Sequence, residues 1–366
     1  MTTVYKRRYE NLLKKMETKE CGGLALCTSP NLFYITGYAP KVDERFQVLF
    51  VSLKHPPILV VPKLYQDEAE KNCWVEEQII VNDGDNIEFL MASLMERMKI
   101  SGSLFALDET MQINKAYPIL KNHPQERIIV ADEIFSELRV IKDEYEINML
   151  EESGKICDEV MDLACKYCRP NISEVEIKDY VEQEFKKRNV RDCYSNLIAS
   201  GENTSLPHHS TGNRLLEHGD VVYFDIGGTY NKYWSDCTRT FYIGEPPKGF
   251  LDTYQIVKNA QQKAREKIKP GITAEELYFT AYNELEEMNL GKYFIHRLGH
   301  GLGLEGHENL SINKGNKIEL REGMVFSIEP GVYFKGKYGI RIEDTVLVTK
   351  YGHKSFNKFN RELILL

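Results

Sequence analysis

The segment from His296 to Leu310, HRLGHGLGLEGHENL, holds the residues whose types and spacing are best suited to chemistry. His296, His300 and His307 follow one another at intervals of four and seven residues, with glycines between them. Glycine lets a backbone approach a crowded centre, and here it leaves room around His300. A single histidine is more often a satisfied core residue than a ligand. The meaning of this segment therefore depends on which other groups the fold brings to it.

Two carboxylates come from residues 219–243, GDVVYFDIGGTYNKYWSDCTRTFYI. The pattern predicts two strands joined by a turn rich in Gly, Thr and Asn. Folding the segment about Tyr230 and Asn231 places Asp225 directly opposite Asp236. Two buried acids that face each other repel, and a shared cation relieves the cost of burying them. The alternative is that Asp225 lies at a turn edge and Asp236 is solvated.

Two more carboxylates come from residues 323–349, GMVFSIEPGVYFKGKYGIRIEDTVLVT. Glu329 ends one predicted strand, just before a Pro-Gly turn. Glu343 is expected inside another strand, where the period of two places Arg341 on the same face. The alternatives are a solvated strand end for Glu329 and a surface ion pair between Arg341 and Glu343.

Taken together, these residues form a donor set that is rich in oxygen and contains one imidazole. The set consists of Asp225, Asp236, His300, Glu329 and Glu343. Carboxylates that bridge two ions suit a pair of divalent cations, with Mn²⁺ as the first choice and Co²⁺ or Zn²⁺ as alternatives, better than a structural zinc. The sequence therefore predicts a site with two divalent metal ions.

The elements that must position these residues divide into two parts. The first part alternates apolar runs with amphipathic segments and contains neither a phosphate loop nor a GxGxxG motif. We expect strands at 48–53, 57–62 and 127–132 and helices at 5–16 and 86–98. A long helix is expected to begin near Asp143 and to end by Pro170. We place the boundary between residues 132 and 141 and assign residues 1–133 to an N-terminal α/β domain and 134–366 to a C-terminal domain.

A weak internal repeat is present in the second part. PNISEVE at 170–176 resembles PGITAEE at 270–276, and each copy opens a helix with a capping-box pattern. Such patterns are common, so chance is the alternative. Otherwise the repeat indicates two similar half-domains, and a site between them would draw residues from both.

Composition limits the classes of function. The net charge of −8 and a pI of about 5.7 argue against a surface for nucleic acid or for an anionic membrane. The first residues lack the apolar core of a signal peptide, and the run PILVVP is too short to cross a bilayer. The eight cysteines are scattered like free thiols of a reducing cytosol, and for Cys165-x-x-Cys168 ordinary helix cysteines are favoured over a zinc site. We expect a cytoplasmic protein.

The motifs FDIG, SDCTRT, GHGLGLEGHE, SIEPGVY and GIRIED occur in this order. In this series the chain resembles the pita-bread metallopeptidases, among them the Xaa-Pro aminopeptidases and the Xaa-Pro dipeptidases, or prolidases. SPNLFYITGY at 29–38 resembles the accessory domain of the Xaa-Pro branch. The resemblance implies a small creatinase-like N-terminal α/β domain and a C-terminal α+β pita-bread domain, in which helices flank a curved antiparallel sheet with pseudo-two-fold symmetry. It also implies a homodimer.

The resemblance also implies a role for each metal ligand. Asp225 would chelate the first metal, Asp236 and Glu343 would bridge both metals, and His300 and Glu329 would hold the second. A hydroxide that bridges the metals would be the nucleophile, and Glu329 would carry the proton to the leaving nitrogen.

The remaining roles fall to residues around the metals. His208 and His307 match positions that contact the substrate and stabilise the tetrahedral intermediate, although His209 is an alternative to His208. His296 matches a residue of the pocket wall near the proline ring. Arg341 matches an arginine that orients the bridging carboxylate.

The implied activity is hydrolysis of the peptide bond between an N-terminal residue and a penultimate proline, with short peptides of this kind as substrates. Prolidases of this size often carry an arginine four residues after the His307 position, where it holds a dipeptide carboxylate. Here that position is Ser311, which favours longer peptides. The alternatives are a hydrolase of another small C–N compound, such as a cyclic amidine, a ureido compound or an amide, and a binding module that retained the metal site without catalysis.

Overall fold

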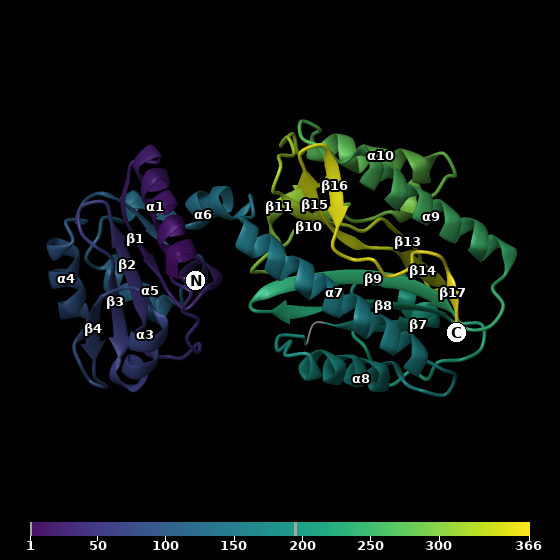
Figure 1. Ribbon diagram of the computed structural model, residues 1–366, viewed down its shortest axis with the longest axis horizontal. Helices are drawn as coiled ribbons and strands as arrows, with labels where there is room; N and C mark the ends of the chain where they lie inside the picture. The colour runs from purple at the N-terminus through teal and green to yellow at the C-terminus, as the bar shows by residue number, and fades with distance from the viewer. Residues whose placement is uncertain (1, 194–195) are drawn as a thin grey trace. The chain divides into compact units, whose positions relative to one another are not determined.

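The computed structural model describes residues 2–193 and 196–366 and separates into two compact units (Figure 1). The first unit ends at Arg139 and the second begins at Val140. The sequence-based boundary after residue 133 falls inside helix α6 (Asp132–Arg139), which the structure keeps whole in the first unit.

The first unit is a mixed α/β domain. Its helices and strands are α1 (Thr2–Thr18), β1 (Cys21–Leu26), α2 (Pro30–Thr36), β2 (Val48–Ser52), β3 (Ile58–Pro62), α3 (Gln66–Asn72), β4 (Glu77–Val81), α4 (Ile87–Arg97), β5 (Leu104–Leu107), α5 (Ile113–Leu120), β6 (Ile128–Val130) and α6. The sheet order is β4-β3-β2-β1-β5-β6, in which β1 runs parallel to β5 and antiparallel to β2. The strands and helices expected from the sequence in this unit are confirmed.

The first half of the second unit packs helices on an antiparallel sheet. Its elements are α7 (Glu144–Tyr167), α8 (Glu174–Lys187), β7 (Leu197–Ser200), β8 (Val221–Tyr230) and β9 (Tyr233–Tyr242), and β17 (Ile364–Leu365) adds to the sheet edge beside β9. The predicted long helix begins after Asp143, and a capping box of Asp143 and Glu146 forms its start. Cys157, Val160 and Ala164 lie at helical spacing on its buried face and share a core with β8 and β9.

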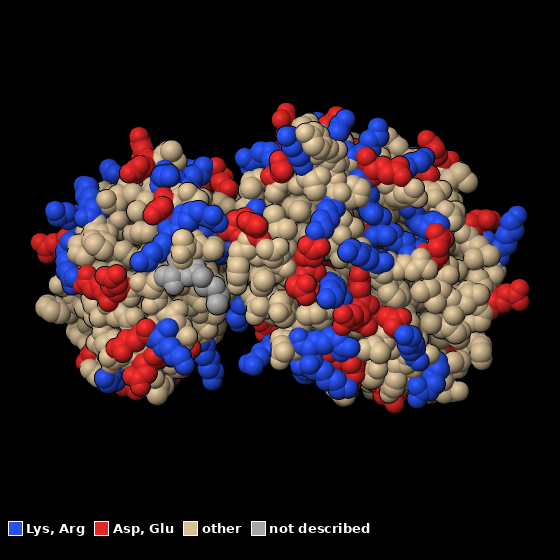
Figure 2. All heavy atoms as spheres, in the orientation of Figure 1, with Lys and Arg blue, Asp and Glu red and all other residues tan. Residues whose placement is uncertain are grey.

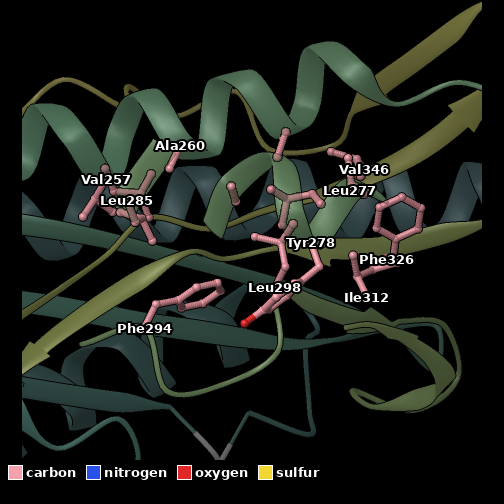
Figure 3. Packing of buried hydrophobic residues seen from close by; sticks show 14 of the residues in the cluster. Val257, Ala260, Leu277, Tyr278, Leu285, Phe294, Leu298, Ile312, Phe326 and Val346 are labelled. Atoms are coloured by element: carbon pink, nitrogen blue, oxygen red, sulfur yellow. The ribbon is translucent and has the colours of Figure 1, made fainter. Parts of the chain in front are cut away.

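The second half repeats this arrangement. Its elements are α9 (Lys248–Lys267), α10 (Ala274–Glu286), β10 (Gly299–Gly301), β11 (Glu308–Ile312), β12 (Val325–Ile328), β13 (Gly331–Phe334), β14 (Tyr338–Arg341), β15 (Asp344–Thr349) and β16 (Gly352–Ser355). The main sheet has the order β11-β10-β12-β15-β16, and β13 pairs with β14. Figure 3 shows Leu277 and Tyr278 of α10 packed with Ile312 and Phe326 of the sheet. Burial of these apolar side chains holds the helices on the sheet.

The internal repeat predicted from the sequence is present in the structure. Complete capping boxes begin both helices, formed by Ser173 and Glu176 at α8 and by Thr273 and Glu276 at α10. The N-cap residue of each helix also forms an antiparallel bridge with an extended segment of its own half. The second unit therefore consists of two similar halves, and the predicted site residues come from both.

On the face shown in Figure 2, acidic and basic side chains are interspersed. Among the described residues, none of the helices combines the length and the apolar character needed to span a membrane. The eight cysteines are all free thiols.

Candidate metal centre

The hairpin of β8 and β9 brings Asp225 and Asp236 to one face of a sheet, but its predicted register is wrong. Asp225 lies opposite Thr238, and Asp236 lies opposite Gly227. The two acids are thus diagonal neighbours on the same face, not a directly opposed pair. This spacing lets both carboxylates approach a common centre without facing each other across the strands.

The register differs because the turn lies one residue further along the chain than predicted. Tyr230 pairs with Tyr233, so the two loop residues are Asn231 and Lys232. Both have positive φ, 48° and 75°, as a type I′ hairpin turn requires. Asn tolerates this conformation well, whereas Lys is unusual there, and the sequence pattern did not identify Lys232 as a turn residue.

His300 presents one ring nitrogen to the acids. Its Nδ1 donates to the Gly301 carbonyl at 3.1 Å, so Nε2 keeps a free lone pair. That Nε2 lies 3.3 Å from Glu329 Oε1 and 3.7 Å from Asp236 Oδ2. A Cβ on the preceding Gly299 would lie 1.8 Å from the Ser327 carbonyl oxygen, so only glycine permits β10 to approach β12 this closely.

Glu343 does not lie inside a strand, as the sequence analysis expected, but in the break between β14 and β15. The break turns its buried carboxylate inward, where Oε2 accepts a hydrogen bond from the Thr238 hydroxyl at 2.6 Å. Within the described part of the chain, Glu343 Oε1 has no hydrogen-bond partner although it is buried. A buried carboxylate oxygen without a partner is costly unless a cation or water satisfies it.

These groups fit a divalent cation. Ligand atoms of Asp236, His300 and Glu343 all lie within 4.8 Å of one another, and Glu329 is in contact with His300. The donor set contains several carboxylates and one imidazole whose lone pair is free, and a cation would satisfy Glu343 Oε1. Oxygen-rich sets of this kind suit Mn²⁺ and similar ions.

The electrostatics of the site favour bound positive charge. Burial, and then repulsion from Asp225, raises the pKa of Asp236 well above its usual range. Burial raises the pKa of Glu343 in the same way, with repulsion from Asp236 as the next cause. Burial also raises the pKa of Glu329 to about 7 and lowers that of His300 to about 3, so the imidazole is neutral near neutral pH. A cation would offset the repulsion among the acids.

Arg341 supplies part of the positive charge, but its direct partner is Asp225. The buried guanidinium forms an ion pair with Asp225 and donates from Nε to the Thr238 hydroxyl at 3.2 Å. Thr238 in turn donates to Glu343. Among the described residues, Arg341 is thus linked to Glu343 through Thr238, and because both side chains are buried, the surface ion pair between Arg341 and Glu343 is excluded.

His296 lies in a hydrogen-bonded chain that begins at Arg341. The guanidinium donates a hydrogen bond to the Tyr333 hydroxyl at 2.8 Å. The hydroxyl in turn donates its own proton to His296 Nε2 at 3.0 Å. His296 Nδ1 donates to the Arg297 carbonyl at 2.7 Å. Burial lowers the pKa of His296 to about 4, so the ring is neutral and fixed in one tautomer.

His307 packs against the candidate ligand His300, with ring centroids 4.0 Å apart. Burial is the main cause that lowers its pKa, and the charges of Arg297 and His208 contribute. His307 is therefore a neutral imidazole beside the carboxylates.

His208 and His209 have different surroundings. The carbonyl of Pro207, which precedes His208, accepts a hydrogen bond from Arg341 at 3.2 Å. The exposed His208 itself lies close enough to contribute to the lowered pKa of both His296 and His307. His209 instead contacts Glu174, with 2.9 Å between Nε2 and Oε2. Of the two histidines, His208 is the one near the site.

Arg297 lies between His296 and His300 in the sequence, and the sequence analysis gave it no role. Its charge lowers the pKa of His307 and of Glu329, so it lies within electrostatic reach of both. Its position between His296 and His300 in the motif was the available signal. Ser311 lies opposite His300 in the pairing of β10 and β11 and brings no charge.

Comparison with known proteins identifies the family of the chain. The model of metallopeptidase family M24 matches residues 148–350, and the creatinase/prolidase N-terminal domain matches residues 8–141. An uncharacterized peptidase of Staphylococcus epidermidis is 32% identical over 351 residues, which cover 95% of this chain and 98% of that protein.

Solved structures extend the likeness to the whole fold. A dipeptidase from Pyrococcus horikoshii superposes with a TM-score of 0.93 at 30% identity, covering 98% of this chain and 100% of that one. A prolidase from Thermococcus sibiricus superposes with a TM-score of 0.93 at 34% identity, covering 99% of each chain. The chain therefore belongs to metallopeptidase family M24, with a creatinase-type N-terminal domain followed by a catalytic domain of the pita-bread fold.

Proposed function

We propose that this chain is a dinuclear metallopeptidase that hydrolyses the bond between an N-terminal residue and a penultimate proline. The observation that carries the proposal is the buried Glu343 carboxylate, which has an oxygen unsatisfied within the described residues and lies in a group with Asp236 and His300. Membership of family M24 supports peptide hydrolysis, and the prolidase among the solved relatives supports proline as the second residue.

The metal ions would be held by the donor set predicted from the sequence, namely Asp225, Asp236, His300, Glu329 and Glu343. When bound, divalent ions would supply an activated water near neutral pH and polarise the scissile carbonyl. Arg341 would keep the Asp225 carboxylate oriented, because it forms an ion pair with that group from a buried position.

The protein's own residues would manage the proton and the developing charge. Glu329 is suited to carry a proton from the attacking water to the leaving imino nitrogen, since its carboxylate borders His300 and is oriented by the Ser327 hydroxyl at 3.1 Å. His307 and His208 would donate hydrogen bonds to the oxygen of the tetrahedral intermediate. His296 and Tyr333 would form the wall beside the proline ring.

The position of Arg297 is relevant to the length of the peptide substrate. Ser311 replaces the arginine that often holds a dipeptide carboxylate, and this favoured longer peptides in the sequence analysis. Arg297 supplies a guanidinium in the same motif, and its charge reaches His307 and Glu329. We propose that Arg297 binds the free carboxylate of an Xaa-Pro dipeptide and that dipeptides are the preferred substrates.

The experiment compares an Xaa-Pro dipeptide with the Xaa-Pro-Xaa tripeptide that shares its first two residues, using Mn²⁺-loaded protein and a chelated control. We expect cleavage of both peptides, a higher kcat/KM for the dipeptide, and loss of activity on chelation. Arg297→Met should raise KM for the dipeptide about tenfold or more, the size expected for a charge-assisted contact, and should change the tripeptide little.

The outcomes separate the parts of the proposal. Failure of metal-loaded protein to cleave either peptide would refute the Xaa-Pro assignment and direct attention to small cyclic amidines and ureido compounds. Faster cleavage of the tripeptide, or equal effects of Arg297→Met on both peptides, would refute the role of Arg297 alone.

A further inference from the structure

Glu174 is a buried carboxylate outside the metal centre, and it accepts an unusual set of hydrogen bonds. It is the first residue of α8 and is 0% exposed. Its Oε1 accepts from the backbone N–H and the hydroxyl of Ser200, both at 2.7 Å, and from Asn203 Nδ2 at 3.0 Å. Its Oε2 accepts from His209 Nε2 at 2.9 Å and from the Gly212 N–H at 3.3 Å.

Every one of these donors belongs to the segment 200–212, which starts at the last residue of β7 and carries His208. Ser200 begins the segment, Gly212 ends it, and His209 is the neighbour of His208. A carboxylate offers two oxygens with several lone pairs and no competing donor, so Glu174 can accept all these bonds at once. It therefore fixes both ends of the segment and the residue beside His208.

The segment is fixed from the other side as well. The Leu206 carbonyl accepts from the Tyr223 hydroxyl at 2.8 Å, and the Pro207 carbonyl accepts from Arg341 Nη1 at 3.2 Å. His208 follows directly after these two residues. Its backbone thus lies between anchors on the metal-centre side and the Glu174 carboxylate on the helix side.

The repeat within the second unit shows that the fold alone does not require this carboxylate. At the corresponding first position of α10 stands Ala274, which is also 0% exposed. The backbone contacts are the same in both halves: Glu174 donates its N–H to the Arg214 carbonyl at 3.0 Å, and Ala274 donates to the Ile318 carbonyl at 2.9 Å. The second half, which lacks a histidine segment of this kind, therefore has the methyl group of Ala274 where the first half has the Glu174 carboxylate.

Helix capping does not explain Glu174 either. A negative charge in the first turn favours a helix in general, but α8 already begins with the complete capping box of Ser173 and Glu176. The Glu174 carboxylate points to a different segment of the chain and contributes no bond to the helix itself among those described.

We propose that Glu174 is a positioning residue that holds segment 200–212 so that His208 faces the reacting carbonyl. The catalytic consequence rests on the proposed function, whereas the ordering of the segment does not. Loss of the carboxylate leaves the Ser200 and Gly212 amides and the His209 ring without their acceptor, and the segment then moves by enough to misplace His208.

The test measures cleavage of an Xaa-Pro dipeptide by Mn²⁺-loaded variants. Glu174→Ala should lower kcat about 10²-fold with KM nearly unchanged, as expected for a misplaced transition-state group. The double variant Glu174→Ala/His208→Ala should be no slower than His208→Ala alone, because Glu174 acts through His208. Additive losses in the double variant would overturn the proposal.

The control is Glu176→Ala, which removes a carboxylate from the same helical turn but leaves segment 200–212 untouched. It should lower the melting temperature with kcat retained. Where Glu174→Ala fails to fold, Glu174→Gln serves in its place, since it keeps one acceptor oxygen and loses the charge. Equal kcat values for the Glu174 and Glu176 variants at equal stability would overturn the proposal.

Hydrogen–deuterium exchange gives a readout that does not depend on the substrate. In peptides covering residues 197–216, exchange should rise in Glu174→Ala and remain as in the wild type in Glu176→Ala. Unchanged exchange in the Glu174 variant would overturn the positioning role even if no Xaa-Pro peptide is cleaved. Raised exchange together with an absence of Xaa-Pro cleavage would retain that role and refute only the proposed substrate.

Discussion

Glu343 and Asp344 are adjacent buried acids whose charges are neutralised in different ways. Asp344 is paired with Arg239, Arg361 and Arg265, and its pKa is lowered, with Arg239 the largest favourable cause against the opposing effect of burial. Among the described residues, the Glu343 carboxylate accepts a side-chain hydrogen bond only from Thr238, and burial, followed by repulsion from Asp236, raises its pKa. Protein groups therefore stabilise the charge of Asp344, whereas the charge of Glu343 would be stabilised by a bound cation.

This contrast predicts opposite effects of two neighbouring substitutions. Glu343→Gln should raise the melting temperature of the chelated protein, because it removes a repelled buried charge, and should prevent the further rise that Mn²⁺ causes in the wild type. Asp344→Asn should destabilise the protein by about 3–5 kcal/mol with or without metal, because it leaves buried arginines without their carboxylate. The measurement is the melting temperature of both variants and of the wild type, in chelator and in excess Mn²⁺. A fall in the stability of chelated Glu343→Gln would contradict the dependence of Glu343 on a cation.

At the scale of elements, the sequence predicted which segments form helices and strands better than it predicted how the strands pair. Capping-box patterns identified the starts of α8 and α10, since that signal is local. The register of β8 and β9 depended on whether the turn was centred one residue earlier, and Lys232 gave no local sign of its positive φ. The break that turns Glu343 inward is set by contacts with Thr238, which is 105 residues distant in the chain, so no local pattern could reveal it.

The candidate site was more predictable than the contacts that support it. The donor residues stood out because an apolar core alone has no use for several acids in buried strands or for a histidine flanked by glycines. The roles proposed for Arg297 and Glu174 were not predicted from the sequence, because a charged residue in a helix or a motif is usually solvated. Only the packing shows that Glu174 is fully buried and that the Arg341 guanidinium forms its ion pair with Asp225.

The β8–β9 turn offers a prediction for an element. Lys232 has φ of 75°, at the second position of a type I′ turn where glycine is preferred. Lys232→Gly should therefore stabilise the protein by about 0.5–1 kcal/mol, since glycine adopts this conformation without strain. Lys232→Ala, which loses the same side chain but keeps the Cβ, is the control and should give no such gain. Urea unfolding of the second unit measures both, and equal changes in the two variants would show that the strain is absent.

At the scale of the whole molecule, the five proposed metal ligands come from the two halves of the second unit. Asp225 and Asp236 lie on β8 and β9 of the first half, whereas His300, Glu329 and Glu343 belong to the second half. Metal binding at these ligands should therefore stabilise the unit that begins at Val140, by about 4 kcal/mol when free metal exceeds its dissociation constant about 1,000-fold.

The two tryptophans of the chain can separate these effects, because Trp74 lies in the first unit and Trp234 in the second. In Trp74→Phe protein, the fluorescence of Trp234 should report an unfolding transition that moves to lower temperature on chelation. In Trp234→Phe protein, the fluorescence of Trp74 should report a transition that chelation does not shift, since the donors are all in the other unit. A chelation shift of equal size in both variants would mean that the units unfold as one cooperative body, and that the metal stabilises the entire chain.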